Sequence, residues 1–106
     1  MLKIILSGIL GGDAEVREVG QKKAINFSVA VSMDYKDADG NKVEKTEWVK
    51  AVIWKNESSN SKVNDYLKKG QRVLIEGVPS SDGYIGKDGT AHSSLQVVVK
   101  DLEFLN

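Results

Sequence analysis

Apolar and polar residues alternate along much of the chain, with the period of two that is typical of β-strands. The clearest case is residues 24–33, where Ile25, Phe27, Val29 and Val31 share one face and small or polar residues take the other. Further strands are predicted at residues 2–10, 46–54, 72–78 and 95–105. The pattern therefore indicates five strands.

Turn-forming residues separate these segments. Gly11–Gly12 ends the first strand, and the Asp-Ala-Asp-Gly-Asn stretch at 37–41 predicts a tight turn. Pro79 is expected to end the fourth strand, because proline cannot donate to a central ladder. A long loop should follow it, with turns at 82–83 and 88–89.

One segment has helical spacing. Residues 56–69 are mainly polar, but Val63, Tyr66 and Leu67 recur as they would on one side of a helix. We expect a short helix from about residue 60, capped at its end by Gly70, with Tyr66 in the core.

The order of elements is three strands, one short helix and two strands. It predicts an all-β protein with one short helix, a five-stranded Greek-key barrel of the OB-fold type. The length of 106 residues suits a single domain over residues 1–106. Such barrels bind oligonucleotides or oligosaccharides across strands two and three.

Composition excludes several kinds of chemistry. The chain has no cysteine and one histidine, His92, which excludes disulfides, thiolate metal sites and sites built on several imidazoles. The 37–41 turn lacks the further carboxylates of a calcium loop, and no phosphate-binding glycine loop or nucleophile motif occurs. We expect no metal, no cofactor and no enzymatic activity.

Charge and hydropathy bear on partners and location. The 15 basic and 15 acidic residues cancel, so a nucleic-acid site would have to come from local charge placement. The apolar stretch at 1–10 reads as a strand rather than a signal peptide, since Ser7 and Gly8 interrupt it and no cleavage site follows. No transmembrane run is present, so a cytoplasmic protein without membrane contact is expected.

The predicted third strand carries the most informative pattern. Val49, Ala51 and Ile53 would face the barrel interior, which leaves Trp48, Lys50 and Trp54 on the outer face. Two exposed tryptophans beside a lysine suit a platform on which bases stack. The alternative is that one of them packs under the helix or in a subunit contact, and the pattern alone leaves both open.

Other candidate contacts surround this strand. Tyr35 and Tyr84 lie at the bases of loops, from which a ring could reach a groove on the strands. Each nearby lysine could bind a phosphate or could be an ordinary solvated side chain. These lysines are Lys22, Lys23, Lys36, Lys42, Lys45 and Lys55.

Three segments in order resemble the bacterial and mitochondrial single-stranded DNA-binding protein family. They are residues 3–17 (KIILSGILGGDAEVR), 46–54 (TEWVKAVIW) and 66–77 (YLKKGQRVLIEG). The resemblance covers nearly the whole chain. It implies an OB barrel, usually a homotetramer, that binds single-stranded DNA with little sequence preference in replication, recombination or repair.

The resemblance also implies specific contacts. The family's aromatic contacts with DNA fall on Trp48 and Trp54, on Tyr84, and within about one residue of Tyr35. Its basic contacts fall on Lys3, Lys50 and Lys69. The chain departs from the family at 78–83, where a basic run is replaced by Val-Pro-Ser-Ser-Asp-Gly.

A second departure concerns the C-terminus. The sequence ends at Asn106, without the flexible linker and acidic tip that recruit partner proteins in the family. We therefore expect a short form for which tail-mediated protein partners are unlikely.

Assembly and alternative functions complete the expectations. The apolar strand at 2–10 would form a sheet edge with few charged side chains to prevent pairing. Such an edge favours pairing with another copy of the chain, and we expect a homotetramer. The alternatives are a dimeric replication-restart accessory protein and a protein-interaction or oligosaccharide-binding OB module.

Overall fold

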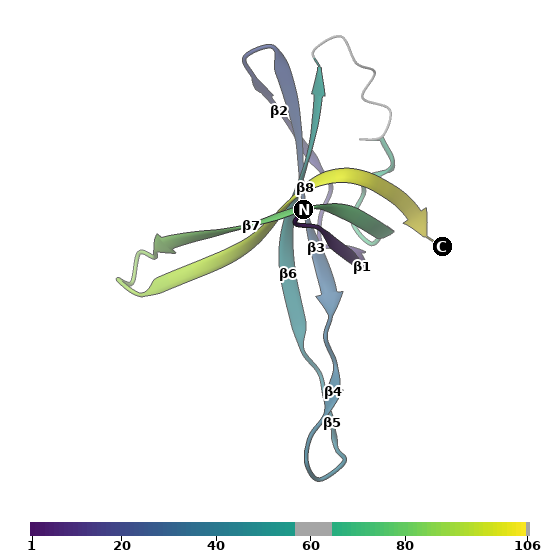
Figure 1. Cartoon of the computed structure of the whole chain (residues 1–106), viewed down its shortest axis with the longest axis vertical. Helices are drawn as coiled ribbons and strands as arrows, with labels where there is room; N and C mark the ends of the chain where they lie inside the picture. Colours follow the sequence, from purple (N-terminus) through teal and green to yellow (C-terminus); the bar gives the residue numbers. More distant parts are fainter. Residues whose placement is uncertain (57–64, 106) are drawn as a thin grey trace.

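Eight β-strands make up nearly all of the regular structure in the described residues. The computed structural model describes residues 1–56 and 65–105 (Figure 1). The strands are β1 (Ile4–Leu10), β2 (Glu15–Val19), β3 (Lys22–Ser32), β4 (Tyr35–Lys36), β5 (Lys42–Val43), β6 (Thr46–Asn56), β7 (Arg72–Ile85) and β8 (Ala91–Leu105).

Five of these strands close into a barrel. Hydrogen-bonded neighbours follow the order β1-β7-β8-β6-β3, and β3 pairs back to β1 through Leu10 and Val29. All the pairings are antiparallel except that of β6 with β8. This Greek-key connectivity is that of the OB-fold, so the predicted fold class is confirmed.

The core lies inside this barrel and uses the inward residues of its strands. The prediction that Ile25, Phe27 and Val29 of β3 point inward is confirmed, because Ile25 and Val29 are fully buried and Phe27 is nearly so. The largest fully buried side chains are Leu10, Ile25, Val29, Leu67, Val73, Ile75 and Val97. Burying each such aliphatic side chain stabilises the fold by roughly 1.5–3 kcal/mol, and this burial fixes the strands that carry the outer face.

Gly77 allows β7 to approach β8 closely. The ladder between β7 and β8 changes register between Glu76 and Gly77. A Cβ atom at Gly77 would overlap the backbone carbonyl of Val98 and come within 2.8 Å of the Val97 side chain. Only glycine fits this bulge, where the strand turns along the barrel wall.

Two hairpins, here called arms, project from the barrel, and the β2–β3 hairpin projects from it as well (Figure 1). The first arm comprises residues 33–45 and contains β4 and β5, with the predicted 37–41 turn at its tip. The second arm comprises residues 82–94, the outer parts of β7 and β8 beyond the pairing with β6, and its strands pair from Asp82 with Ser94 to Ile85 with Ala91.

The second arm corrects the prediction that Pro79 ends a strand before a long loop. The strand β7 continues to Ile85, and residues 82–83 lie within it instead of forming a turn. Pairing of β7 with β1 stops at Gly77, so in the described residues Pro79 faces β8 on one edge only. Proline is tolerated at such an edge, because its missing N–H costs no ladder bond there.

β2 was not predicted. All five of its side chains are exposed, so it has no alternating apolar pattern. It forms by pairing with β3, from Glu15 opposite Asn26 to Val19 opposite Lys22. Its backbone hydrogen bonds, rather than buried side chains, hold it in place.

The predicted helix is not found in the part that can be tested. Residues 60–64 of that prediction lie outside the described residues, and residues 65–66 form a single 3₁₀ turn. Residues 67–70 are not helical, because their backbone groups bond to β1 and the segment after it. Ala14 donates to the Leu67 carbonyl at 2.9 Å, and Gly70 donates to Leu10 at 2.9 Å.

The placement of Tyr66 in the core was also wrong. Its side chain is 64% exposed, and its ring lies 5.9 Å from that of Phe104, centroid to centroid. Leu67 occupies the buried position instead.

Candidate nucleic-acid interface

The outer face of β6 presents two tryptophans on either side of a lysine. Trp48 is 56% exposed and Trp54 45% exposed, and Lys50 between them is exposed too. Val49 and Ala51, which point to the other face of the same strand, are buried, as the sequence predicted. The alternation of a strand therefore places both indoles on the face that meets solvent.

The register of β3 against β6 shows what lies beside these side chains. Ala30 is opposite Trp48, Ser28 opposite Lys50, and Ala24 opposite Trp54. Small residues thus flank the large rings, and each indole remains about half exposed. Along the strand the two tryptophans are separated by roughly 20 Å, enough for several stacked bases.

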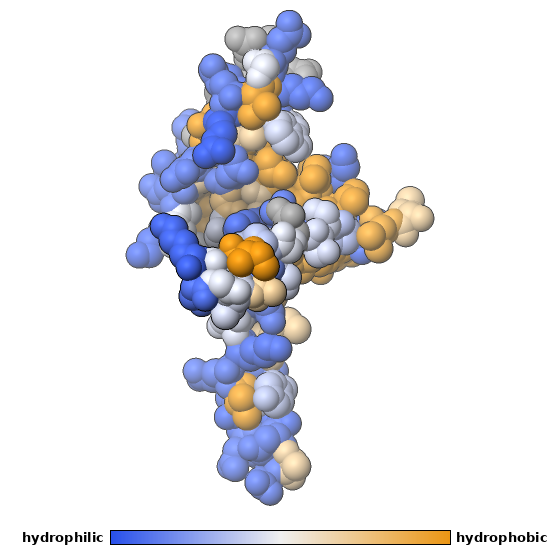
Figure 2. All heavy atoms as spheres, turned by 90° about the vertical axis from the view of Figure 1, so that its left-hand side faces the viewer, coloured by the Kyte–Doolittle hydropathy of each residue, from blue (hydrophilic) through white to orange (hydrophobic). Residues whose placement is uncertain are grey.

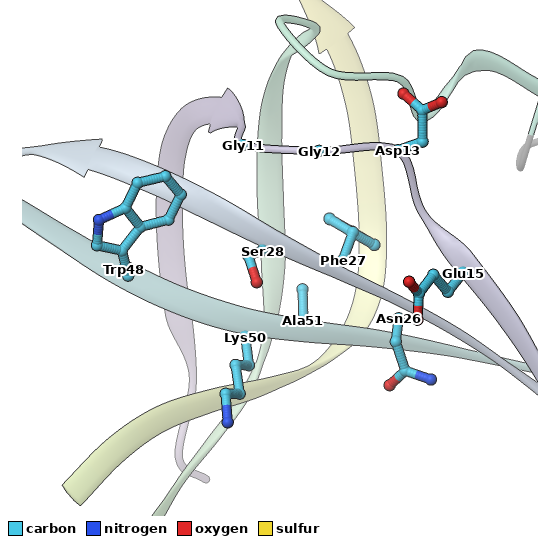
Figure 3. A pocket seen from close by; sticks show the side chains of 10 residues that line it. All are labelled: Gly11, Gly12, Asp13, Glu15, Asn26, Phe27, Ser28, Trp48, Lys50 and Ala51. Carbon is cyan, nitrogen blue, oxygen red and sulfur yellow. The ribbon is translucent and has the colours of Figure 1, made fainter. Parts of the chain in front are cut away.

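Two neighbouring hollows, which share three lining residues, lie along this face. The larger has a volume of about 530 Å³ and the smaller about 280 Å³, and both border Asn26, Lys50 and Ala51. We call the two together the groove. Figure 3 shows the larger hollow, with the Gly11–Asp13 segment along one side. The smaller hollow is lined by Arg17, Val19, Ala24, Asn26, Lys50, Ala51, Val52, Trp54 and Gln96.

Gly11 sets the position of the Trp48 ring. A Cβ atom at Gly11 would lie 2.5 Å from Cζ3 and 2.7 Å from Cη2 of Trp48. The ring therefore packs directly on the backbone of Gly11, toward which it extends in Figure 3. Any larger residue there would have to displace the indole.

The groove carries charges of both signs. Lys50 and Arg17 supply positive charge, whereas Asp13 and Glu15 line the larger hollow. The Asp13 carboxylate accepts a hydrogen bond from the Lys69 backbone N–H at 2.9 Å and lies 4.0 Å from the Lys68 ammonium. Asp13 thus fixes the 65–70 segment beside this end of the groove.

The register of β3 against β6 shows that the lysines predicted at the ends of these strands lie on different faces of the sheet. Lys22 is two residues before Ala24, so it shares the face of the groove. Lys23 and Lys55 are paired with each other and lie on the opposite face, where Lys55 borders a hollow with Lys100 and Phe104. Lys22 lies with the tryptophans and the other two do not.

Three further predicted lysines do not line the groove. Lys3 forms an ion pair with Glu76, across the pairing of β1 with β7. Lys45 lies 3.5 Å from Glu47 at the base of the first arm. Lys69 is exposed beside Asp13, so it borders the groove without lining it.

The first arm presents Tyr35 and Lys36 to solvent. Both are exposed, and they pair with Val43 and Lys42. Asp34 fixes the base of the arm: its carboxylate accepts from the Lys45 N–H at 3.0 Å and lies 3.6 Å from the Lys42 ammonium. The backbone hydrogen bond from Lys45 and the charge of Lys42 lower the pKa of Asp34 below its usual value.

The second arm carries a stacked pair of rings. Tyr84 and His92 are opposite each other in the ladder, with centroids 5.4 Å apart and planes 21° apart. His92 Nε2 lies 2.8 Å from the Thr90 hydroxyl, which donates to Asp88 at 2.7 Å. The hydrogen bonds from Thr90 lower the pKa of Asp88.

Register places this pair on the same side as the groove. Gln96 lies opposite Lys50 in the parallel pairing of β6 with β8 and lines the smaller hollow. His92 is four residues before Gln96 on the same strand, so its side chain points to the same side of the sheet. Tyr84 is paired with His92, so its side chain points to that side too. The second arm thus extends the face that Lys50 and Trp54 begin.

Several groove residues were missed by sequence reasoning. They are Gly11, Gly12, Asp13, Glu15, Arg17, Asn26, Ser28 and Gln96. Glu15 and Arg17 were missed because β2 has no apolar pattern. The alternation had placed Asn26 and Ser28 on the polar face of β3. Had the pairing of β3 with β6 been predicted, that face would have been recognised as part of the groove.

Other kinds of site are not found in the described part of the chain. Within residues 1–56 and 65–105, no group of three or more acidic, histidine or cysteine side chains is placed to hold a metal ion. Nor does any helix in these residues have the length and apolar character needed to cross a membrane.

Comparison with known proteins decides the family. The profile of the single-strand binding protein family matches residues 1–105. The chain belongs to this family. The resemblance inferred from three short segments is thereby confirmed over nearly the full length.

Relatives in the single-strand binding protein family include bacterial and mitochondrial proteins. The single-stranded DNA-binding protein of Neisseria meningitidis serogroup B is 38% identical over 104 residues, which cover 97% of this chain and 59% of that protein. The mitochondrial protein of Drosophila melanogaster is 28% identical over 101 residues, 95% of this chain and 68% of its own length. The chain thus spans about three fifths of the Neisseria protein.

Solved structures agree with the family assignment. The complex of a Plasmodium falciparum SSB with ssDNA superposes with a TM-score of 0.80 at 25% identity, covering 100% of this chain and 96% of that one. The small single-stranded DNA-binding protein of Streptomyces coelicolor gives a TM-score of 0.77 at 15% identity, covering 97% and 93%. The second likeness supports the fold alone.

Proposed function

We propose that this protein binds single-stranded DNA by stacking bases on Trp48 and Trp54, and that it acts by binding rather than by catalysis. The observation that carries the proposal is the pair of exposed indoles on one strand face, separated by Lys50 and bordered by the two hollows of the groove. Stacking needs only the flat face of a base, so the binding tolerates many sequences. Family membership supports the same conclusion.

Positive groups around the groove would hold the phosphate backbone. Lys50 and Arg17 line it, and Lys22 lies on the same face. The arms would add Tyr35, Lys36 and Tyr84 for a strand that continues past the groove. Lys3, Lys23, Lys45, Lys55 and Lys69 lie outside the groove, so they would contact only DNA that passes around the barrel.

Binding of labelled oligonucleotides tests this proposal directly. A fluorescein-labelled dT oligomer should show saturable anisotropy change, and a duplex of equal length should compete poorly because its bases are not available for stacking. Affinity should fall as salt rises, by about 0.7 in log K per unit log salt for each phosphate neutralised. Equal affinity for duplex, or no dependence on salt, would contradict the proposal.

We further propose that several copies assemble through β1, as a homotetramer. Ile5 is 63% exposed and Ile9 is 38% exposed, and both lie on the outer side of this strand, so that side is largely apolar. Association would remove this surface from water and give DNA a longer path over several grooves. Such a protein would act in replication, recombination or repair, in the cytoplasm.

Light scattering at micromolar concentration tests the assembly. Four copies of the 11.6 kDa chain are expected. A mass of one chain would contradict assembly, and a mass of two chains would favour a dimer instead. Ile5→Lys should yield a smaller species that keeps its fold, because the side chain is exposed in the single chain.

A further inference from the structure

The middle of the groove carries hydrogen-bonding groups rather than rings. Asn26 lies on β3 between Glu15 of β2 and Val52 of β6, and it is directly opposite both. Figure 3 shows the Asn26 and Glu15 side chains next to each other at one end of the larger hollow. A carboxylate and a carboxamide therefore lie between the positions of the two tryptophans.

The Glu15 carboxylate has no protein partner in the part of the chain that is described. It forms no ion pair within 4.0 Å and no side-chain hydrogen bond among residues 1–56 and 65–105. Among the same described residues, the Asn26 side chain makes only one long hydrogen bond, from its N–H to the Ala24 carbonyl at 3.5 Å. Both groups are thus available to a ligand.

A carboxylate in this place opposes the binding of phosphate. Glu15 lines the same hollow as Lys50. Its negative charge repels a phosphate, and the repulsion grows as the phosphate comes closer. It is therefore badly placed for contact with the backbone. The edge of a base is a different target, because bases present hydrogen-bond donors as well as acceptors.

Bases differ in what they offer to a carboxylate. Cytosine carries an amino group at N4, which donates to an acidic side chain, whereas thymine has a carbonyl oxygen at the matching position. If this thymine oxygen faced the Glu15 carboxylate, the two would repel each other, because both accept hydrogen bonds and neither donates one. Asn26 can accept or donate, so it can accompany Glu15 on either base.

We propose that Glu15, supported by Asn26, gives the groove a base preference: it favours cytosine over thymine relative to a groove without the carboxylate. This inference rests on the proposed binding of single-stranded DNA. Stacking on Trp48 and Trp54 supplies affinity for any base, and the acidic edge between them adjusts that affinity according to the base.

The test compares Glu15→Gln with a matched control. Glu18→Gln removes the same charge from the same strand, but Glu18 lies on the opposite face, paired with Lys23. Both side chains are exposed, so both variants should keep the fold. Dissociation constants for labelled dC and dT oligomers of equal length would be measured by anisotropy, at one salt concentration and one pH.

Glu15→Gln should raise the ratio of the dC to the dT dissociation constant about fivefold, the lower end of the range for one base-edge contact. Glu18→Gln should leave that ratio unchanged, although it can tighten binding to both oligomers. An equal ratio in wild type and both variants would overturn the base preference and leave the binding function intact. Failure of the wild type to bind either oligomer would overturn both.

Discussion

The barrel and its two arms are stabilised by different means. In the barrel, apolar side chains from five strands and from Leu67 are buried against each other, and seven of the largest are fully buried. In the arms, every residue of β4 and β5 is exposed or half-buried, and hydrogen bonds within turns hold the backbone. Figure 2 shows the same contrast: the arm at the lower end of the view is mainly hydrophilic, and apolar residues gather around the middle.

This difference separates the rigid part of the candidate interface from the adjustable part. Trp48 and Trp54 stand on β6, whose other face is packed into the core, so their positions are set before a ligand arrives. Tyr35 and Tyr84 stand on arms that few buried contacts restrain, and such segments open at low cost in free energy. We expect the groove to supply most of the affinity and the arms to adapt to the strand.

The largest effect should come from the core. Ile75→Ala removes a fully buried side chain and should lower the free energy of unfolding by about 2–5 kcal/mol. Tyr35→Ala, in the first arm, should change it by less than about 0.5 kcal/mol. Urea denaturation measures both, and comparable losses in the two variants would show that the arm is part of the cooperative core.

The next effect concerns binding by the groove. Trp54→Ala should weaken binding of a dT oligomer by about 1–3 kcal/mol, the range for losing one stacked base. The unfolding temperature should change little, because the indole is 45% exposed. Trp54→Phe is the matched control, since it keeps a ring and should retain most of the affinity. Unaltered binding by a folded Trp54→Ala variant would refute the stacking role.

A smaller loss is expected from the second arm. Tyr84→Ala should weaken binding by about 1 kcal/mol, the low end of the stacking range, because its support comes from one neighbouring ring. His92→Ala should give part of the same loss by leaving Tyr84 without that support. The effect should be seen only with oligomers long enough to pass beyond the groove, and an equal loss with the shortest bound oligomer would place Tyr84 in the groove instead.

The smallest effect concerns acid and the first arm. Folding lowers the pKa of Asp34 below its ordinary value of 3.8, chiefly through the hydrogen bond from Lys45. The stabilisation is therefore complete above that ordinary value and is lost as the pH falls through the lower folded-state pKa. The chemical shift of the Lys45 amide should titrate in this acidic range in the wild type. Asp34→Asn should abolish that titration, and a titration that persists would assign it to another group.

Elements with a buried face were predictable, and elements without one were not. The alternation in β3 and β6 identified both their inward residues and the exposure of Trp48 and Trp54. The strand β2 and the outer parts of β7 and β8 bury little, so they lack an alternating apolar pattern, and they form by pairing with the next strand across a short turn. The expected helix failed at residues 67–69 for a related reason, since hydrogen bonds to the β1 end replace helical ones.

The candidate site was predictable only in part. Its rings and central lysine stood out because large aromatic residues on a polar face need an explanation. Glu15 and Arg17 enter the groove only because β2 pairs with β3, which the sequence did not indicate. Lys23 and Lys55 were nominated by proximity in sequence, and only the register shows that they lie on the opposite face from Lys22 and Trp54.

The most direct test of the groove as the DNA-binding surface is the fluorescence of each tryptophan alone. Trp48→Phe and Trp54→Phe each leave one indole, since the chain has two tryptophans. On saturation with poly-dT, the emission of both single-tryptophan variants should be strongly quenched, because each remaining indole stacks on a base. Saturable binding by anisotropy without quenching of either tryptophan would contradict the account, because the DNA would then lie on another face of the barrel.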